Sequence, residues 1–298
     1  MRRFFETMKS CDTGGGPHVP RLRWLWLVFV ALFAGCTSIK LVYPRLEWYT
    51  QFKLGKYVKL EPAQEALLKQ DVDAFWAWHR ADELPRYAAE FRALAAVDPE
   101  TIDVATLTAW GDRMGGYGRA AVERAMPGLC ALARTLDDRQ VASIGEQMTE
   151  DLEKFEDEHL KPDEDERRRN AAKRLAKQVK RWSGSLNDAQ EQELDAWRDR
   201  HPLLGAETLA LRQKWRAAFL AALSMHGDPD QCTALGTLFL DPRALRDDAT
   251  QARFEASETE LRQTLSRIIA ASDTRQREHA QRELLKLADD LEALSRRS

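Results

Sequence analysis

The sequence predicts an all-α protein, a multi-helix bundle of about eight to ten helices. Along most of its 298 residues, apolar side chains recur at intervals of three and four, as expected of helices with one buried face. Few stretches alternate between apolar and polar residues as a half-buried strand would. Helix-start patterns also recur along the chain, so the apolar periodicity and the capping residues both indicate helices.

Four short segments share one helix-start pattern, which we call the capping boxes. An Asp or Asn at the N-cap accepts a hydrogen bond from the backbone N–H three residues on, and a Gln at that third position reaches back. In the first box the N-cap is Glu61, but Pro62 suits the first helical position. The boxes are Leu60–Gln64, Leu136–Gln140, Leu186–Gln190 and Ser272–Gln276. We expect each of them to open a helix.

Three Asp-Pro pairs, at 98–99, 228–229 and 241–242, predict further helix starts, because Asp caps well and Pro fits the first turn. Gly227 predicts a helix end, and Gly115–Gly116 predicts a weak point inside a long helix. The expected helices cover 61–83, 85–96, 99–134, 137–160, 163–182, 187–200, 206–225, 229–239, 242–271 and 273–296.

The N-terminal part contains an apolar run, Trp24–Ala34, preceded by Arg21 and Arg23. A span needs about 20 apolar residues, so this run is too short for one and suits the core of a signal peptide. The segment that ends in Cys36, Leu-Phe-Ala-Gly-Cys, resembles the bacterial lipobox. An ordinary secretory signal or a membrane anchor is the alternative.

The lipobox resemblance implies that residues 1–35 are removed as a signal peptide and that Cys36 becomes the lipidated N-terminus, carrying acyl chains such as palmitate. Thr37, in place of the Asp that retains lipoproteins in the inner membrane, implies the outer membrane of a Gram-negative bacterium. We therefore expect a protein anchored by lipid on the periplasmic face of that membrane.

We expect residues 36–59 to form a lipidated tether and residues 60–298 to form a single helical domain. The tether is rich in aromatic residues, among them Tyr43, Trp48 and Phe52. We expect these rings to pack on the first long helix; the alternative places them at the membrane interface, where amphipathic rings are favoured.

The chain contains 45 Lys or Arg and 48 Asp or Glu residues. Removal of residues 1–35, which hold five basic and two acidic side chains, leaves a mildly acidic protein of 40 basic and 46 acidic ones. This charge balance gives no reason to expect a nucleic-acid partner. Once Cys11 is removed and Cys36 is acylated, Cys130 and Cys232 remain in an oxidising compartment. We expect them to form a disulfide; two buried thiols are the alternative.

Catalytic motifs are absent from the sequence: there is no Gly-x-Ser-x-Gly, no phosphate-binding loop and no His-Glu-x-x-His. Glu156 and His159 have the spacing found in di-iron bundles, but no second copy accompanies them, so we expect no metal and no cofactor. His79 and Glu83 lie one helical turn apart, as an acid and a base would; we favour a buried, hydrogen-bonded pair. We expect a protein that is not an enzyme.

A run of charges is the most unusual feature of the sequence. Residues 150–166 are mostly acidic, and residues 167–181 are basic. Acidic residues early and basic residues late stabilise a helix through its dipole, so a solvated face explains the run most simply. The alternative is a binding surface for an acidic partner or anionic lipid. Its residues would be Arg167, Arg168, Arg169, Lys173, Arg174, Lys177, Lys180, Arg181 and Trp182.

Several segments in a fixed order carry a family resemblance: the lipobox, the aromatic tether, Leu60–Glu65, Trp78–Arg80 and Trp182–Gln190. The chain resembles a family of uncharacterised proteobacterial lipoproteins, classed as a domain of unknown function, and this resemblance implies no activity. The capping boxes are also similar to the LTxxQ motif of small helical periplasmic chaperones, although no box has Thr at the cap.

These observations predict a membrane-anchored periplasmic lipoprotein that binds another envelope protein, as a chaperone or assembly factor. One alternative is a structural protein that binds lipid or an envelope polymer through the basic helix. A second alternative is an enzyme that acts on envelope polymers with carboxylates as acid and base. The expected partners are the membrane, through the N-terminal lipid, and an envelope protein.

Overall fold

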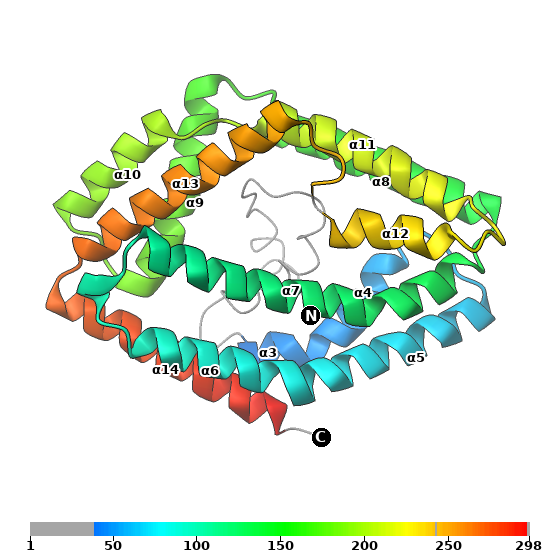
Figure 1. The fold of residues 1–298 in the computed structure, drawn as a ribbon, viewed down its shortest axis with the longest axis horizontal. Coiled ribbons are helices and arrows are strands. Elements are labelled where there is room, and N and C mark those ends of the chain that lie inside the picture. The colour runs from blue at the N-terminus through cyan, green and yellow to red at the C-terminus, as the bar shows by residue number, and fades with distance from the viewer. Residues whose placement is uncertain (1–38, 242, 297–298) are drawn as a thin grey trace, which may run out of the picture.

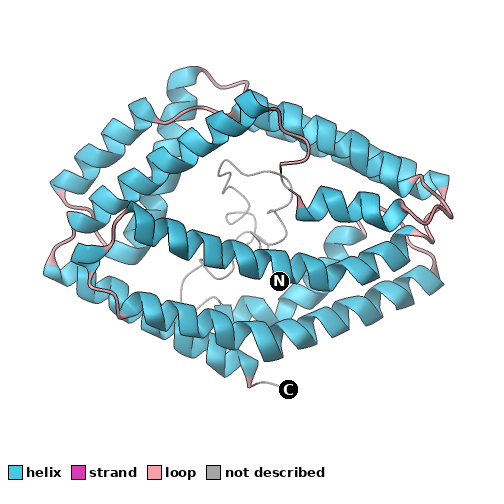
Figure 2. Cartoon of the chain, viewed as in Figure 1, coloured by secondary structure: helices cyan, strands magenta, loops and turns pink. Residues whose placement is uncertain are grey.

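The fold, given by a computed structural model that describes residues 39–241 and 243–296, confirms the all-α prediction. Figure 1 and Figure 2 show helices joined by short loops, with no strand in these ranges. Three short helical segments come first: α3 (Ile39–Val42), η1 (Tyr43–Arg45) and α4 (Leu46–Leu54).

Ten longer helices follow within the described ranges. They are α5 (Pro62–Trp78), α6 (Leu84–Ala95), α7 (Val104–Ala133), α8 (Asp138–His159), α9 (Glu164–Ser183), α10 (Asp188–Arg200), α11 (Gly205–Leu223), α12 (Gln231–Leu240), α13 (Asp248–Ala270) and α14 (Thr274–Ser295). Each of the four capping boxes opens a helix, as expected: α5, α8, α10 and α14.

The Asp-Pro pairs do not open the helices that the sequence analysis assigned to them. The side chains of Asp98, Asp228 and Asp241 each accept a hydrogen bond from the N–H two residues later, which forms a tight turn in place of the start of a long helix. At Asp98 this turn caps only the short 3-10 helix η3 (Pro99–Thr101). The N-caps of α7 and α13 are Asp103 and Asp247 instead, each bonded to the N–H three residues on. These two helices therefore begin about five residues later than expected.

Two expected interruptions are also different in the structure. Gly115 and Gly116 lie inside α7, which continues through them. The expected break near residue 84 is a π turn, His79–Glu83, in which the N–H of Leu84 bonds the carbonyl of His79. Pro85 lacks an N–H, and its ring would meet the carbonyl four residues earlier in a regular helix, so the wider turn accommodates it.

The long helices pack in pairs around an open outline, and α7 crosses between its two sides (Figure 1). Helix α14 packs along α6 and also contacts α9; α10 lies between α9 and α13; α8 lies along α11. Helix α7 contacts α5, α12 and α13, so it joins the two sides.

Three hydrophobic clusters stabilise this arrangement. The first joins α3, η1, α5, α6 and α14, and contains Ile39, Tyr43 and Phe91. The second joins α7, α8, α11 and α12, and the third joins α9, α10 and α13. Because Ile39 and Tyr43 belong to the first cluster, the segment that begins at Ile39, within the expected tether, is part of the packed protein. The assignment of residues 60–298 to one domain stays a prediction.

The four capping boxes meet in two pairs, and the third-position glutamines form the contacts. Gln64 and Gln140 donate to each other, with Nε2–Oε1 distances of 3.0 and 2.7 Å. Gln64 also donates to the carbonyl of Thr135, and Gln140 to that of Lys59, each just before the partner's box. The two helix starts are thus related by an approximate two-fold arrangement, and both side chains are buried.

The second pair repeats this arrangement between α10 and α14. Gln276 donates to Gln190 at 2.9 Å and to the carbonyl of Ser185, just before the partner's box. In the other direction, Asn187 donates to the carbonyl of Ala271, which lies just before the box that contains Gln276. Gln190 and Gln276 are 0% and 2% exposed, so loss of one side chain would leave its partner unpaired away from water.

We predict that this pairing is energetically coupled. Gln190→Ala and Gln276→Ala should each lower the free energy of unfolding by about 1–3 kcal/mol. The double variant should lose less than the sum of the two, because one shared contact disappears in both. Urea unfolding of the four proteins in this cycle measures the coupling, and Gln178→Ala, at an exposed site on α9, is the control. Additive losses would contradict the coupling.

Candidate functional site

Helix α9, which carries the predicted basic surface, has strong end signals. The side chain of Asp163 accepts a hydrogen bond from the N–H of Glu166, and the first turn is acidic. Basic residues lie in the last turn, and Gly184 then leaves the helix with φ +77°, a conformation that glycine adopts without strain. Ala171 and Val179 are buried, so one side of α9 packs against the protein.

The nine predicted residues divide into two sets in the structure. Four of them are exposed and spaced by four, four and three positions, which places them on one helix face. Within residues 39–241 and 243–296, none of the four forms an ion pair. We call this set the basic stripe; it consists of Arg169, Lys173, Lys177 and Lys180.

The other five residues are partly buried, and one of them, Arg168, holds α9 against α10. Arg168 donates to the carbonyls of Arg198, Asp199 and His201 at 3.0–3.2 Å, so it caps the C-terminal end of α10. Burial lowers the pKa of Arg174. Arg181 lies over the ring of Trp182, at 4.9 Å from its centroid. Sequence spacing alone does not separate these side chains from the stripe, because their burial depends on the helices that α9 packs against.

An acidic groove between α8 and α11 was not foreseen from the sequence. Its volume is about 810 Å³, and its lining includes Glu146, Glu150 and Glu153. Arg216 of α11 donates to the carbonyl of Gly145 on the groove floor, at 2.9 Å. The three carboxylates are separated by four and then three residues, which places them on one face of α8. This spacing is visible in the sequence and could have predicted an acidic face there.

His79 and Glu83 lie inside the protein, with exposed fractions of 1% and 0%. The hydroxyl of Tyr43 lies 2.8 Å from Nδ1 of His79, and Arg86 donates to Glu83 at 2.9 Å. Burial lowers the pKa of His79 to about 4 and raises the pKa of Glu83. Both side chains are therefore buried, as we expected, but they are not bonded to each other: His79 is bonded to Tyr43, which joins η1 to the π turn, and Glu83 to Arg86.

The other candidates for chemistry are not assembled into a site. The ring of His159 stacks on Phe155, with centroids 4.4 Å apart, and Glu156 is exposed. In the part of the chain that the structure describes, no three His, Cys, Asp or Glu residues are grouped so that they could hold a metal ion. The same residues contain no helix with the length and apolar character of a membrane span.

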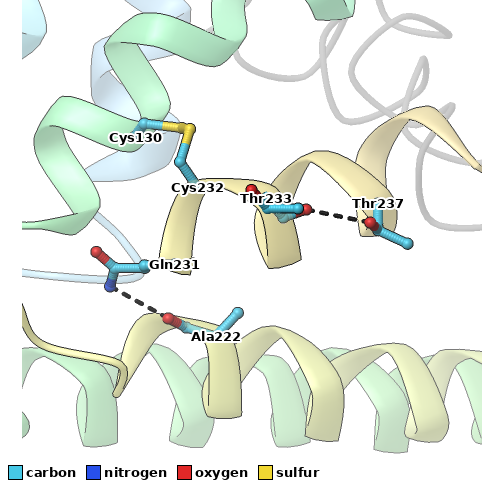
Figure 3. Close-up of a disulfide and its surroundings, with 6 residues drawn as sticks. All are labelled: Cys130, Ala222, Gln231, Cys232, Thr233 and Thr237. Atoms are coloured by element: carbon cyan, nitrogen blue, oxygen red, sulfur yellow. Dashed lines mark hydrogen bonds between the residues drawn. A yellow bond between two sulfur atoms is a disulfide. The ribbon is translucent and has the colours of Figure 1, made fainter. Parts of the chain in front are cut away.

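Cys130 of α7 and Cys232 of α12 form a disulfide, with Cα atoms 5.4 Å apart (Figure 3). The bond closes a loop of 102 residues, for which chain entropy predicts a stabilisation of about 5 kcal/mol. Beside it, the side chain of Gln231 donates to the carbonyl of Ala222, which ties the start of α12 to the end of α11. Cys36 lies outside the described residues.

We predict that acid destabilises the protein through His79. The unfolded histidine has a pKa near 6.5 and the folded one about 4, so the unfolded state binds more protons between these values. Stability should therefore fall by up to roughly 3 kcal/mol as the pH drops from 6.5 to 4. Urea unfolding across this range should show a shallower pH dependence for His79→Gln. An equal slope in both proteins would contradict the prediction.

Comparison with known families gives a match over most of the chain. The profile of a family of unknown function, DUF6279, matches residues 56–251, a range that contains three capping boxes, the basic stripe and both disulfide cysteines. No curated protein and no solved structure matches the chain. Because the profile covers well over half of the sequence, the chain belongs to this family of unknown function, as the order of its segments led us to expect.

Proposed function

We propose that the protein is a lipoprotein, anchored through Cys36 on the periplasmic face of the outer membrane, that binds an acidic envelope protein through the basic stripe. In this proposal it acts as a chaperone-like or assembly protein and performs no catalysis. The lipobox-like segment supports the anchor, and the stripe supports the binding role.

The observation that carries this proposal is that the charges of the stripe repel one another and so destabilise α9. Arg169, Lys173 and Lys177 follow one another at i, i+4, a spacing at which like charges repel. The helix dipole favours cations in the last turn, which accounts for Lys180 but not for the other three. On a protein whose mature form is net acidic, a surface of this kind attracts a negatively charged partner.

The stripe also has the dimensions and rigidity of a docking surface. Eleven residues separate its ends, which corresponds to about 16 Å along a helix. Its helix is held by Ala171 and Val179 on the buried side and by the contacts of Arg168 with α10. A charged surface fixed in this way raises the association rate and selects the partner more than it raises affinity.

We predict that charge reversal in the stripe removes partner binding. In cells, photocrosslinking from Lys180→benzoylphenylalanine should capture an acidic envelope protein, and Lys173→Glu with Lys177→Glu should lower the yield about tenfold or more. Arg168 is left intact because it caps α10. Helicity and melting should remain close to those of the parent protein, since both lysines are exposed.

The matched control is Arg139→Glu with Lys214→Glu, two exposed sites on α8 and α11 that give the same change in net charge. Equal capture by both double variants would show that the stripe is not the binding surface. Capture of phospholipid or polysaccharide in place of protein would support a structural role for the helix. Turnover of an envelope polymer that one carboxylate substitution abolishes would contradict the non-enzymatic role.

We predict that the mature protein begins at Cys36 and carries lipid there. Mass spectrometry of the membrane-extracted protein should show an N-terminal fragment that starts at Cys36 and is heavier by its acyl chains. Cys36→Ala should remain unprocessed and lose the normal membrane fractionation. A variant that matures and fractionates like the parent would contradict the anchor.

A further inference from the structure

The segment α3–η1–α4 is amphipathic, and its apolar residues do not all face the protein. Ile39, Tyr43, Leu46 and Thr50 recur at intervals of four, three and four and are buried against the body. The opposite face carries Leu41, Trp48 and Phe52, with exposed fractions of 60%, 58% and 41%. We expected the aromatic residues of this segment to pack on the first long helix; Tyr43 is packed, whereas Trp48 and Phe52 are exposed.

These three side chains are unusual on this molecule. Only one other large hydrophobic side chain in the described residues is exposed to this degree, Leu285 of α14. Trp48 and Phe52 stack on each other, with centroids 5.2 Å apart, so they form one continuous apolar surface. An exposed apolar cluster of this kind marks a site of contact with another protein or with a membrane.

Two basic side chains lie against aromatic rings of this segment. Lys56 lies 5.1 Å from the ring of Phe52, and Lys53 lies 5.5 Å from that of Tyr49. Five Lys or Arg residues but only one acidic residue, Glu47, occur between positions 39 and 59. The segment is therefore basic on a net acidic protein, and it combines cations with aromatic rings as interfacial helices do.

The segment is attached firmly to the body, so its outward face has a defined direction. Lys40 forms an ion pair with Asp290 of α14, whose side chain is 6% exposed. Tyr43 is bonded to His79, and α4 packs on α5, beside which it lies in Figure 1. Rotation of the segment would break these contacts and expose the buried face.

The position of the proposed anchor identifies the partner of this surface. Cys36 precedes Ile39 by three residues, which span about 10 Å at most. An acylated Cys36 lies at the bilayer surface, so the packed start of α3 is held within that distance of the headgroups. A bilayer with anionic lipids fits the observed chemistry, because tryptophan and phenylalanine partition into the interface and cations bind its negative surface.

We propose that Leu41, Trp48, Phe52, Lys53 and Lys56 form a membrane-docking surface that rests on the inner leaflet of the outer membrane and inserts Trp48 and Phe52 into its interface. This inference rests on the lipid anchor of the proposed function. The anchor then does more than tether the protein: together with the docked segment, it sets the orientation of the whole body on the membrane.

The test uses the lipidated full-length product in vesicles of phosphatidylethanolamine and phosphatidylglycerol with brominated acyl chains, which quench tryptophan fluorescence at the interface. Removal of residues 1–35 takes away two of the nine tryptophans. If only Trp48 meets the lipid, brominated chains should quench roughly one seventh of the emission, and Trp48→Phe should abolish nearly all of that quenching. Trp182→Phe, in the rival basic helix, should keep it.

A second pair of variants tests the charges. Lys53→Glu with Lys56→Glu should weaken the quenching in anionic vesicles at least about twofold and should leave it unchanged in phosphatidylcholine vesicles. Arg139→Glu with Lys214→Glu is the control for net charge. Trp48 is mostly exposed, so thermal melting of Trp48→Phe should match that of the parent and confirm its folding.

The outcomes separate this inference from the proposed function. A lipidated protein that captures its partner but shows the same quenching with and without Trp48 overturns the docking surface alone. Quenching that disappears with Trp182→Phe assigns membrane contact to α9 and overturns it as well. Crosslinks from position 48 to a protein, without lipid quenching, also overturn it. A mass spectrum without acyl chains at Cys36 overturns the anchor and the docking surface together.

Discussion

The arrangement of the helices depends on four buried glutamines. The Oε1 of each glutamine accepts a hydrogen bond from the N-cap N–H of its own helix, and its Nε2 donates to a neighbouring helix start. One side chain therefore caps its own helix and also binds that helix to its neighbour. A buried amide without partners would cost free energy, and this makes other pairings of the helix starts unfavourable. The pairs Gln64–Gln140 and Gln190–Gln276 therefore set which helix starts meet.

Hydrophobic packing and the disulfide hold together the helices that lie between these two glutamine pairs. Helices α6 and α14 pack along each other in the cluster that also holds α3, while Cys130–Cys232 joins α7 to α12 in the second cluster. Around the His79 ring, aromatic side chains exclude water, and Tyr43 brings the N-terminal segment into the same core. The N-terminal segment is thus a structural part of the body.

The two proposed surfaces are linked through this packing. The docking surface lies on α3–η1–α4, α3 contacts α14, and α14 contacts α9, which carries the basic stripe. One rigid helix thus separates the proposed membrane contact from the proposed partner site. In such an arrangement the membrane-bound segment holds the stripe at a set height and direction, which reduces the freedom lost when a partner binds.

The sequence by itself determined the fold class and most of the helix ends, because these depend on local signals. The capping boxes at Leu60–Gln64 and Leu136–Gln140 needed only backbone and side-chain atoms a few residues apart. The sequence also indicated the cysteine pair to consider, because the lipobox resemblance assigns Cys11 to a signal peptide and Cys36 to a lipid anchor. Local signals failed where two such signals lay five residues apart, as at Asp98 and Asp103, because either aspartate can cap a helix: Asp98 caps a short 3-10 helix, and Asp103 forms the N-cap of α7.

The tertiary structure decided which side chains are available for contact. Arg168 and Arg169 are neighbours of the same charge, yet Arg168 caps α10 and Arg169 is exposed. Tyr43 and Trp48 are both aromatic, yet one is buried and the other is exposed. The pairing of the glutamines and the groove between α8 and α11 are equally non-local. In each case the outcome depends on helices that lie far away in the sequence, which composition and spacing do not specify.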